Sequence, residues 1–215
     1  MDDKPQTVSL RYYGISPWEI EVIYNIFNEK FEVIQDVTER HEYLQHLGSK
    51  SLQMDCEECV SALTITIPLP FSEEFFKWFE FREWDKVKHI IKEMKRRRGN
   101  RKAIMVQILF GCWVDGQMSI PDYPNVQFVI NSNESHDFNS AVEKIDFMVD
   151  LLPYHLNHSR VKKVGRTTQV VYRYATDSGK WYVSYVWTRE GGGVFHPDSM
   201  KYDDENSSSQ KRHGM

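Results

Sequence analysis

The 215-residue sequence has few cysteines, no long apolar run and no large excess of charge of one sign. Its three cysteines comprise one close pair and one isolated residue, whereas small secreted scaffolds carry many paired cysteines, so we expect reduced thiols. No stretch approaches the roughly 18 apolar residues of a membrane-spanning helix. The acidic start MDDKPQTVSL is also unlike a secretory signal. We therefore expect a cytoplasmic protein that does not associate with membranes.

The sequence also lacks the short motifs of the common catalytic sites. It contains no GxxxxGK[ST] phosphate loop, no GxGxxG after a strand, no GxSxG elbow and no HExxH pair. We therefore assign no catalytic residue and favour a role other than catalysis. An enzyme with an unrecognised motif stays open as an alternative.

Apolar residues are abundant enough to form a core. Hydrophobic residues make up 40% of the chain and aromatic residues 13%, which excludes a wholly disordered, collagenous or coiled-coil protein.

A short strand is predicted at residues 8–14. Ser16, Pro17 and Glu19 then predict a helix start, because a hydroxyl cap, an early proline and a glutamate that bonds back to the cap occur together. Apolar spacing extends this helix as far as Val37.

The middle and the C-terminal half alternate between strand and helix patterns. The predicted elements are a loop at 48–58, a strand at 60–69, a helix at 72–98 whose aromatic part at 75–81 forms a separate turn, a central strand at 103–114, a strand at 126–131, a helix from 135 that stops at Pro153, and a hairpin of strands at 168–175 and 180–187. The two histidines that follow Pro153 are then expected in a loop.

This order of elements predicts a fold class. From residue 60 it matches the split βαβ arrangement of a ferredoxin-like sandwich, with an extra strand that completes the last hairpin. We therefore predict an α+β fold, in which an antiparallel sheet carries helices on one face and an N-terminal strand and helix form an extension. The expected divisions are 1–58 for the extension, 59–197 for the core domain and 198–215 for a disordered tail.

Basic residues are concentrated in two places, although the formal net charge is -4. One cluster ends the predicted helix at 72–98 and continues into the next loop, and the other precedes the last hairpin. We predict a non-catalytic nucleic-acid-binding protein in which these residues contact phosphates, and the sequence leaves open whether the ligand is RNA or DNA. The alternative is that cations at a helix end only complement the helix dipole. The predicted binding residues are Lys92, Lys95, Arg96, Arg97, Arg98, Arg101, Lys102, Arg160, Lys162, Lys163 and Arg166.

Aromatic residues form two further candidate surfaces. If one face of the last hairpin is solvated, Tyr172, Tyr174 and Tyr182 form a platform on which bases stack; the alternative is a packed aromatic sheet. The run FFKWFEF at residues 75–81 has too many large apolar side chains for one helix face. The alternative function is therefore an interaction or regulatory module that binds a protein partner or a second copy of itself through this aromatic helix or through its sheet.

Four residues form a weak candidate metal site. Cys56 and Cys59 have the CxxC spacing of a zinc half-site, and His41 and His46 lie just upstream. The second cysteine pair of a zinc ribbon is missing, however, and the histidines precede the cysteines. We therefore expect no cofactor, with zinc as the alternative.

Overall fold

The computed structural model describes residues 6–47, 59–99, 104–111, 113–114, 117–118, 123–158, 161–162, 165–189, 191–195 and 202–204. The strands are β1 (Thr7–Tyr13), β2 (Glu32–Val37), β3 (Ser61–Ile67), β4 (Ile104–Phe110), β5 (Trp113–Val114), β6 (Gln117–Met118), β7 (Asn125–Ile130), β8 (Thr167–Ala175), β9 (Lys180–Thr188), β10 (Gly191–Phe195) and β11 (Tyr202–Asp204). The helices are α1 (Pro17–Asn28), α2 (Arg40–Gln45), α4 (Glu73–Phe79), α5 (Phe81–Arg98), α6 (Ser135–Glu143) and α7 (Met148–Asn157). The predicted loop at 48–58 lies outside the described residues, as does the predicted tail apart from β11.

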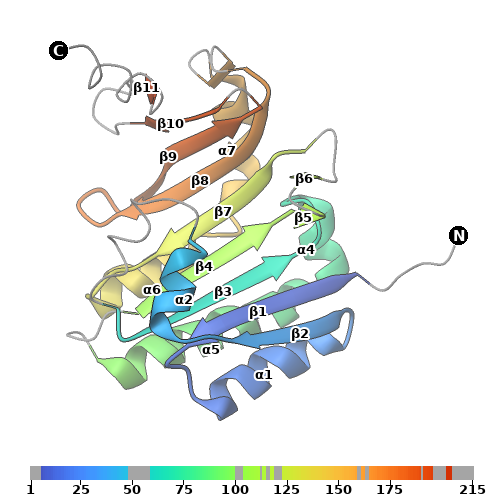
Figure 1. Ribbon diagram of the computed structural model, residues 1–215, viewed down its shortest axis with the longest axis vertical. Helices are drawn as coiled ribbons and strands as arrows, with labels where there is room; N and C mark the ends of the chain where they lie inside the picture. Colours follow the sequence, from blue (N-terminus) through green and yellow to red (C-terminus); the bar gives the residue numbers. More distant parts are fainter. Residues whose placement is uncertain are drawn as a thin grey trace, which may run out of the picture.

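Nine strands form one mixed sheet in the order β11-β10-β9-β8-β7-β4-β3-β1-β2, and β5 pairs with β6 separately (Figure 1). Three strand–helix–strand units follow one another along the chain. In each unit the two strands are parallel and adjacent: β1 with β2, β3 with β4, and β7 with β8. Antiparallel pairs join the units, β1 to β3 and β4 to β7. The sheet therefore contains both parallel and antiparallel pairs.

The predicted ferredoxin-like sandwich is wrong, and the fold is an α/β fold built on this mixed sheet. In a split βαβ unit another strand lies between the two parallel strands that a helix connects. Here β3 and β4 are hydrogen-bonded neighbours, as are β7 and β8. Both arrangements have the same order of elements along the chain, so the difference lies in strand pairing alone. The N-terminal strand β1 pairs with β3 and belongs to the same sheet.

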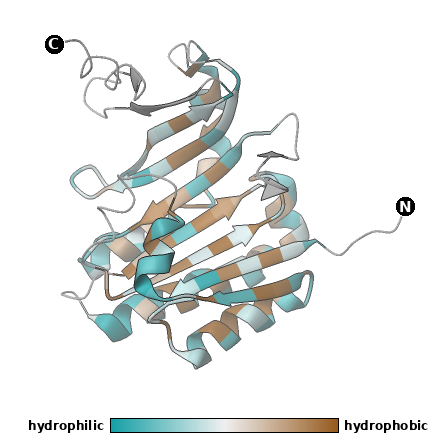
Figure 2. Cartoon of the chain, viewed as in Figure 1, coloured by the Kyte–Doolittle hydropathy of each residue, from teal (hydrophilic) through white to brown (hydrophobic). Residues whose placement is uncertain are grey.

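Helices cover both faces of the sheet rather than one. The larger core joins apolar side chains of α1, α4, α5, α6 and α7 to one face of the strands. On the opposite face, Tyr43 of α2 packs with Tyr13, Met105 and Val129 from three strands. Figure 1 shows α2 in front of the sheet with the other helices behind it, and Figure 2 shows hydrophobic residues along β3 and β4.

Local signals predicted the starts of helices better than their ends. At the start of α1, Ser16 and Glu19 form the expected capping box. That helix ends at Asn28, however, and the apolar positions that extended it belong to β2. The aromatic segment is separate from the basic helix, as predicted, because α4 ends at Phe79. The predicted stop at Pro153 is wrong, since α7 continues through it to Asn157 and includes the first of the two histidines expected in a loop.

No helix in the described part of the chain is both long enough and apolar enough to cross a membrane.

Candidate nucleic-acid interface

Two of the predicted phosphate-binding residues at the end of α5 are held inside the protein. Lys95 is fully buried, and its Nζ donates hydrogen bonds to the carbonyl oxygens of Asn133, at 2.5 Å, and Gly99, at 3.3 Å. Burial lowers the pKa of Lys95 below its ordinary value, although the charge of Glu134 opposes the shift. Lys95 therefore joins the end of α5 to the segment that precedes α6 and has no surface on which to meet a phosphate.

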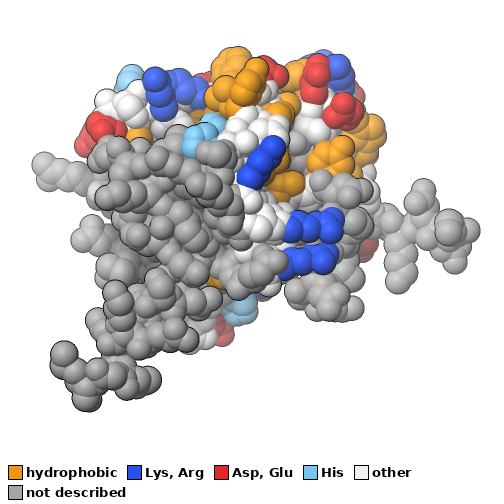
Figure 3. All heavy atoms as spheres, turned by 90° about the horizontal axis from the view of Figure 1, so that it is seen from above, with side chains coloured by type: hydrophobic (Ala, Val, Ile, Leu, Met, Phe, Trp, Pro, Cys, Tyr) orange, Lys and Arg blue, Asp and Glu red, His pale blue; other side chains and the backbone are white. Residues whose placement is uncertain are grey.

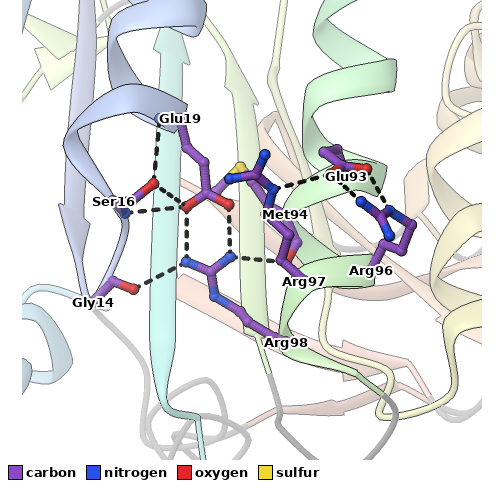
Figure 4. Close-up of polar contacts among 8 residues, drawn as sticks. All are labelled: Gly14, Ser16, Glu19, Glu93, Met94, Arg96, Arg97 and Arg98. Atoms are coloured by element: carbon purple, nitrogen blue, oxygen red, sulfur yellow. Dashed lines mark hydrogen bonds and ion pairs between the residues drawn. The ribbon is translucent and has the colours of Figure 1, made fainter.

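Arg98 is the second internal residue. Its guanidinium makes two 3.1 Å hydrogen bonds to the buried Glu19 carboxylate of α1, and it also donates to the carbonyl of Gly14 at 3.0 Å (Figure 4). Burial by itself would raise the pKa of Glu19, but hydrogen bonds from Arg98 and Ser16 and the charge of Arg98 outweigh it, so the pKa is lowered. The pair joins the start of α1 to the end of α5.

Lys92 is also paired. Its Nζ lies against the Glu143 carboxylate of α6 in an ion pair. Hydrogen bonding from Lys92 lowers the pKa of Glu143, because it stabilises the ionised carboxylate. The lysine therefore links α5 to α6 and brings little uncompensated charge to the surface.

Arg96 and Arg97 remain at the surface. Their side chains are 73% and 47% exposed, and both donate to a single carboxylate, that of Glu93. Figure 4 shows these contacts beside the Arg98 cluster. Hydrogen bonds from Arg96 and then Arg97 lower the pKa of Glu93 to about 2, so this carboxylate is ionised at ordinary pH. Two guanidinium charges thus share one carboxylate, and the group keeps a net positive charge.

An exposed tryptophan completes this surface. The guanidinium of Arg97 lies 4.5 Å from the centroid of the Trp18 ring, and Trp18 is 49% exposed. We define the Arg96–Trp18 surface as Trp18, Glu93, Arg96 and Arg97. It is formed by the first turn of α1 and the last turns of α5, which the internal pair of Arg98 holds together.

The second predicted basic cluster lies at the other end of the sheet. β4 begins beyond the end of α5, β7 is antiparallel to β4, and β8 is parallel to β7. The start of β8 therefore lies near the end of β4, whereas the end of α5 precedes the start of β4. The length of β4, seven residues or about 20 Å, separates these two places. Lys162 and Arg166, which are exposed, precede β8 and so do not join the Arg96–Trp18 surface. The remaining predicted residues, Arg101, Lys102, Arg160 and Lys163, lie outside the described part of the chain.

The predicted tyrosine platform does not form. Tyr172 is fully buried in the larger core, stacked on Phe128, and its hydroxyl lies 2.8 Å from Nδ1 of His155. Tyr174 packs on the same core, with its hydroxyl bound by Lys144. The packed aromatic sheet is therefore the correct alternative for these two tyrosines.

The aromatic run of α4 is also largely internal. Phe75, Phe76 and Phe79 are buried in the larger core. Exposed apolar side chains also occur along α7, where Tyr154 is 75% exposed and Leu151 is 45% exposed. Figure 3, a view from above, shows hydrophobic side chains reaching the surface among scattered Lys and Arg side chains. The predicted aromatic interaction patch at 75–81 is therefore reduced to its exposed members, Trp78 and Phe81.

The candidate zinc site is not assembled among the described residues, where no group of three or more His, Cys, Asp or Glu side chains is placed to hold a metal ion. Cys56 lies outside the described residues. Cys59 is buried, whereas His41 pairs with Glu39 and Nδ1 of His46 lies 2.7 Å from a backbone carbonyl of α2.

Sequence reasoning missed Trp18 and Glu93 as parts of the candidate site. Trp18 fits the apolar spacing of α1, which predicts a buried position. Trp18 is nevertheless 49% exposed, although Glu19 and Ile20 in the same first turn are buried, and no local signal in the sequence marks this difference. Glu93 was visible as the one acidic residue within the basic run, but its contact with both arginines depends on helical spacing of three and four residues.

No protein-family model, curated protein or solved structure matches the chain.

Proposed function

We propose that the protein binds single-stranded nucleic acid through the Arg96–Trp18 surface, without catalysing a reaction on it. The observation that carries the proposal is the shared carboxylate. Two exposed guanidiniums lie next to a half-exposed indole, and within the described part of the chain Glu93 is the one carboxylate paired with them. The proposal is narrower than the sequence prediction, because it leaves out Lys95, which is buried, and Arg98, which is paired with the buried Glu19.

The chemistry of this surface suits a flexible strand. Guanidinium groups bind phosphate oxygens through paired N–H donors. An exposed indole offers a face on which a base of any sequence stacks, and a neighbouring arginine strengthens that contact. Arg101 and Lys102 follow α5 in the sequence but lie outside the described residues, so the proposal does not depend on them.

Replacing both exposed arginines tests the proposal. In the double variant Arg96→Ala/Arg97→Ala, we expect binding to a fluorescein-labelled 12-nucleotide oligo-dT to weaken at least about tenfold at low salt. The slope of log affinity against log salt should fall by about 1.4, because each phosphate contact on a single strand contributes about 0.7. Fluorescence anisotropy over a salt series measures both quantities. Arg98 is left in place because its loss would disturb the fold.

The matched control removes the same charge elsewhere on the same helix. Arg82→Ala/Lys86→Ala takes two exposed basic residues from the first half of α5. We expect this variant to bind within about twofold of the wild type, apart from a small non-specific effect of net charge. Equal loss in the two double variants, or no binding by the wild type at low salt, would contradict the proposal.

A further inference from the structure

β2 is the last strand of the sheet that the described residues form. It pairs with β1 on one side and ends the strand order, and no other described strand pairs with it (Figure 1). An unpaired edge presents backbone N–H and C=O groups on which another extended chain can form hydrogen bonds.

The backbone hydrogen bonds show which residues face outward. The N–H of Glu32 donates to the carbonyl of Gln6, and the N–H of Thr38 donates to the carbonyl of Tyr12. Successive residues of a strand direct their backbone groups to opposite edges, so the even-numbered residues of β2 face β1. Val33, Gln35 and Val37 therefore direct their N–H and C=O groups away from the sheet.

The devices that usually protect an edge strand are mostly absent from β2. Its sequence, EVIQDV, contains neither proline nor lysine, and its register with β1 is regular, without a bulge. Ile34 is 50% exposed and Val37 is 70% exposed. The edge thus combines outward backbone groups with apolar side chains on both faces of the strand.

The surroundings of this edge are acidic. Residues 29–39, which comprise β2 and its flanks, contain four carboxylates, from Glu29, Glu32, Asp36 and Glu39, against the one basic side chain of Lys30. Lys30 is engaged by Glu80, outside this segment, whereas Asp36 is paired with Arg11 of β1. A second copy of β2 would place like charges together, and a nucleic acid would be repelled.

We propose that the β2 edge binds an extended, basic segment of another protein, which adds to the sheet as a tenth strand. Main-chain hydrogen bonds to Val33, Gln35 and Val37 supply the affinity, and basic side chains next to the carboxylates of residues 29–39 supply the selectivity. This site is separate from the Arg96–Trp18 surface and does not depend on nucleic-acid binding.

A backbone-modified peptide tests the proposal without altering the protein. The probe is a fluorescein-labelled peptide KVRVKVRV, compared with EVDVEVDV and with two N-methylated forms of KVRVKVRV. Methylating alternate backbone nitrogens blocks one edge of an extended peptide and leaves the other edge intact. We expect one methylated form to bind at least about tenfold more weakly and the other within about threefold of the parent, with EVDVEVDV the weakest. Equal binding of the two methylated forms, or no binding of KVRVKVRV, would overturn the proposal.

Two substitutions at one position then locate the site on β2. Gln35→Pro removes the outward N–H, which an edge strand tolerates because that group bonds to no neighbouring strand. Gln35→Thr keeps the N–H, and both variants lose the 3.1 Å hydrogen bond from the Tyr12 hydroxyl to the Gln35 side chain. We expect KVRVKVRV to bind at least about tenfold more weakly to the proline variant and nearly normally to the threonine variant. If both variants fold and bind KVRVKVRV equally, the binding site is not the β2 edge. If the proline variant does not fold, the comparison of the two methylated peptides with KVRVKVRV remains the test of strand addition.

Discussion

Neighbouring arginines at the end of α5 have different roles because helical spacing points them in different directions. Arg98 turns inward, where it makes a two-pronged contact with Glu19 and binds backbone carbonyls of Gly14 and Met94. Arg96 lies on the outer surface and contacts only Glu93 among the described residues. The sequence RRR cannot separate these roles, because only the position of α1 determines which arginine meets a buried carboxylate.

This difference predicts unequal losses of stability. Arg98→Ala leaves the buried Glu19 carboxylate without its partner, so we expect the free energy of unfolding to fall by about 3–5 kcal/mol. Arg96→Ala removes an exposed contact and should cost about 0–1 kcal/mol. Urea denaturation at pH 7 measures both values. A loss for Arg98→Ala within 1 kcal/mol of that for Arg96→Ala would show that the Glu19 pair does not hold the helices together.

The same pair sets a pH dependence with a defined sign. The pKa of Glu19 is lower in the folded protein than its ordinary value of 4.5. Its contribution to stability is therefore complete above pH 4.5 and is lost as the pH falls through the lowered pKa. In Glu19→Gln the group no longer titrates, so the decline of stability below pH 4.5 should be shallower than in the wild type. Parallel declines would contradict this contribution.

At the scale of elements, an unusual backbone position separates α4 from α5. Glu80, the one described residue other than glycine with a positive φ, has φ 73° and ψ 124°. A side chain with a Cβ is strained at such an angle. The aromatic density before residue 81 predicted a separate segment, but no glycine or proline marked where it would end.

The strain at Glu80 predicts a difference between two small substitutions. Glu80→Gly and Glu80→Ala both remove the contact with Lys30, but only glycine relieves the positive φ. We expect the glycine variant to be more stable than the alanine variant by about 1 kcal/mol, after the greater chain entropy of glycine in the unfolded state is included. Thermal and urea unfolding measure the difference. A more stable alanine variant would mean that the backbone relaxes at this position.

At the scale of the whole molecule, the sequence predicted most elements but not their pairing. The capping residues of α1 and the alternation of the last hairpin are local, and both predictions are confirmed. The pairing of Leu10 with Ile65, or of Ile65 with Ile108, joins residues more than 40 positions apart. Because each of these strands is apolar on its inward face, the periodic pattern fits several strand orders equally well, and the ferredoxin-like order was one of them.

The sequence indicated the position of the basic cluster in the chain, but it did not indicate which of its side chains are exposed. The basic run lies at the end of α5 that carries the proposed surface, but Lys95 is buried, Arg98 and Lys92 are paired with carboxylates, and the topology places Lys162 and Arg166 elsewhere. The whole molecule thus has a basic surface at the end of α5 and an acidic segment around the β2 edge, although its net charge is small. The Arg96–Trp18 surface and the β2 edge are separate and carry opposite charge, so they suit partners of different chemistry.

The most direct test of the account is a single isosteric change at Glu93. This carboxylate holds both exposed guanidiniums, so it competes with any phosphate for the same donors. In Glu93→Gln the competing charge is gone while the size of the side chain is kept, and we predict that the labelled oligo-dT binds about three- to tenfold more tightly at low salt. Unchanged or weaker binding by a folded Glu93→Gln protein would contradict the claim that Arg96 and Arg97 form a phosphate site.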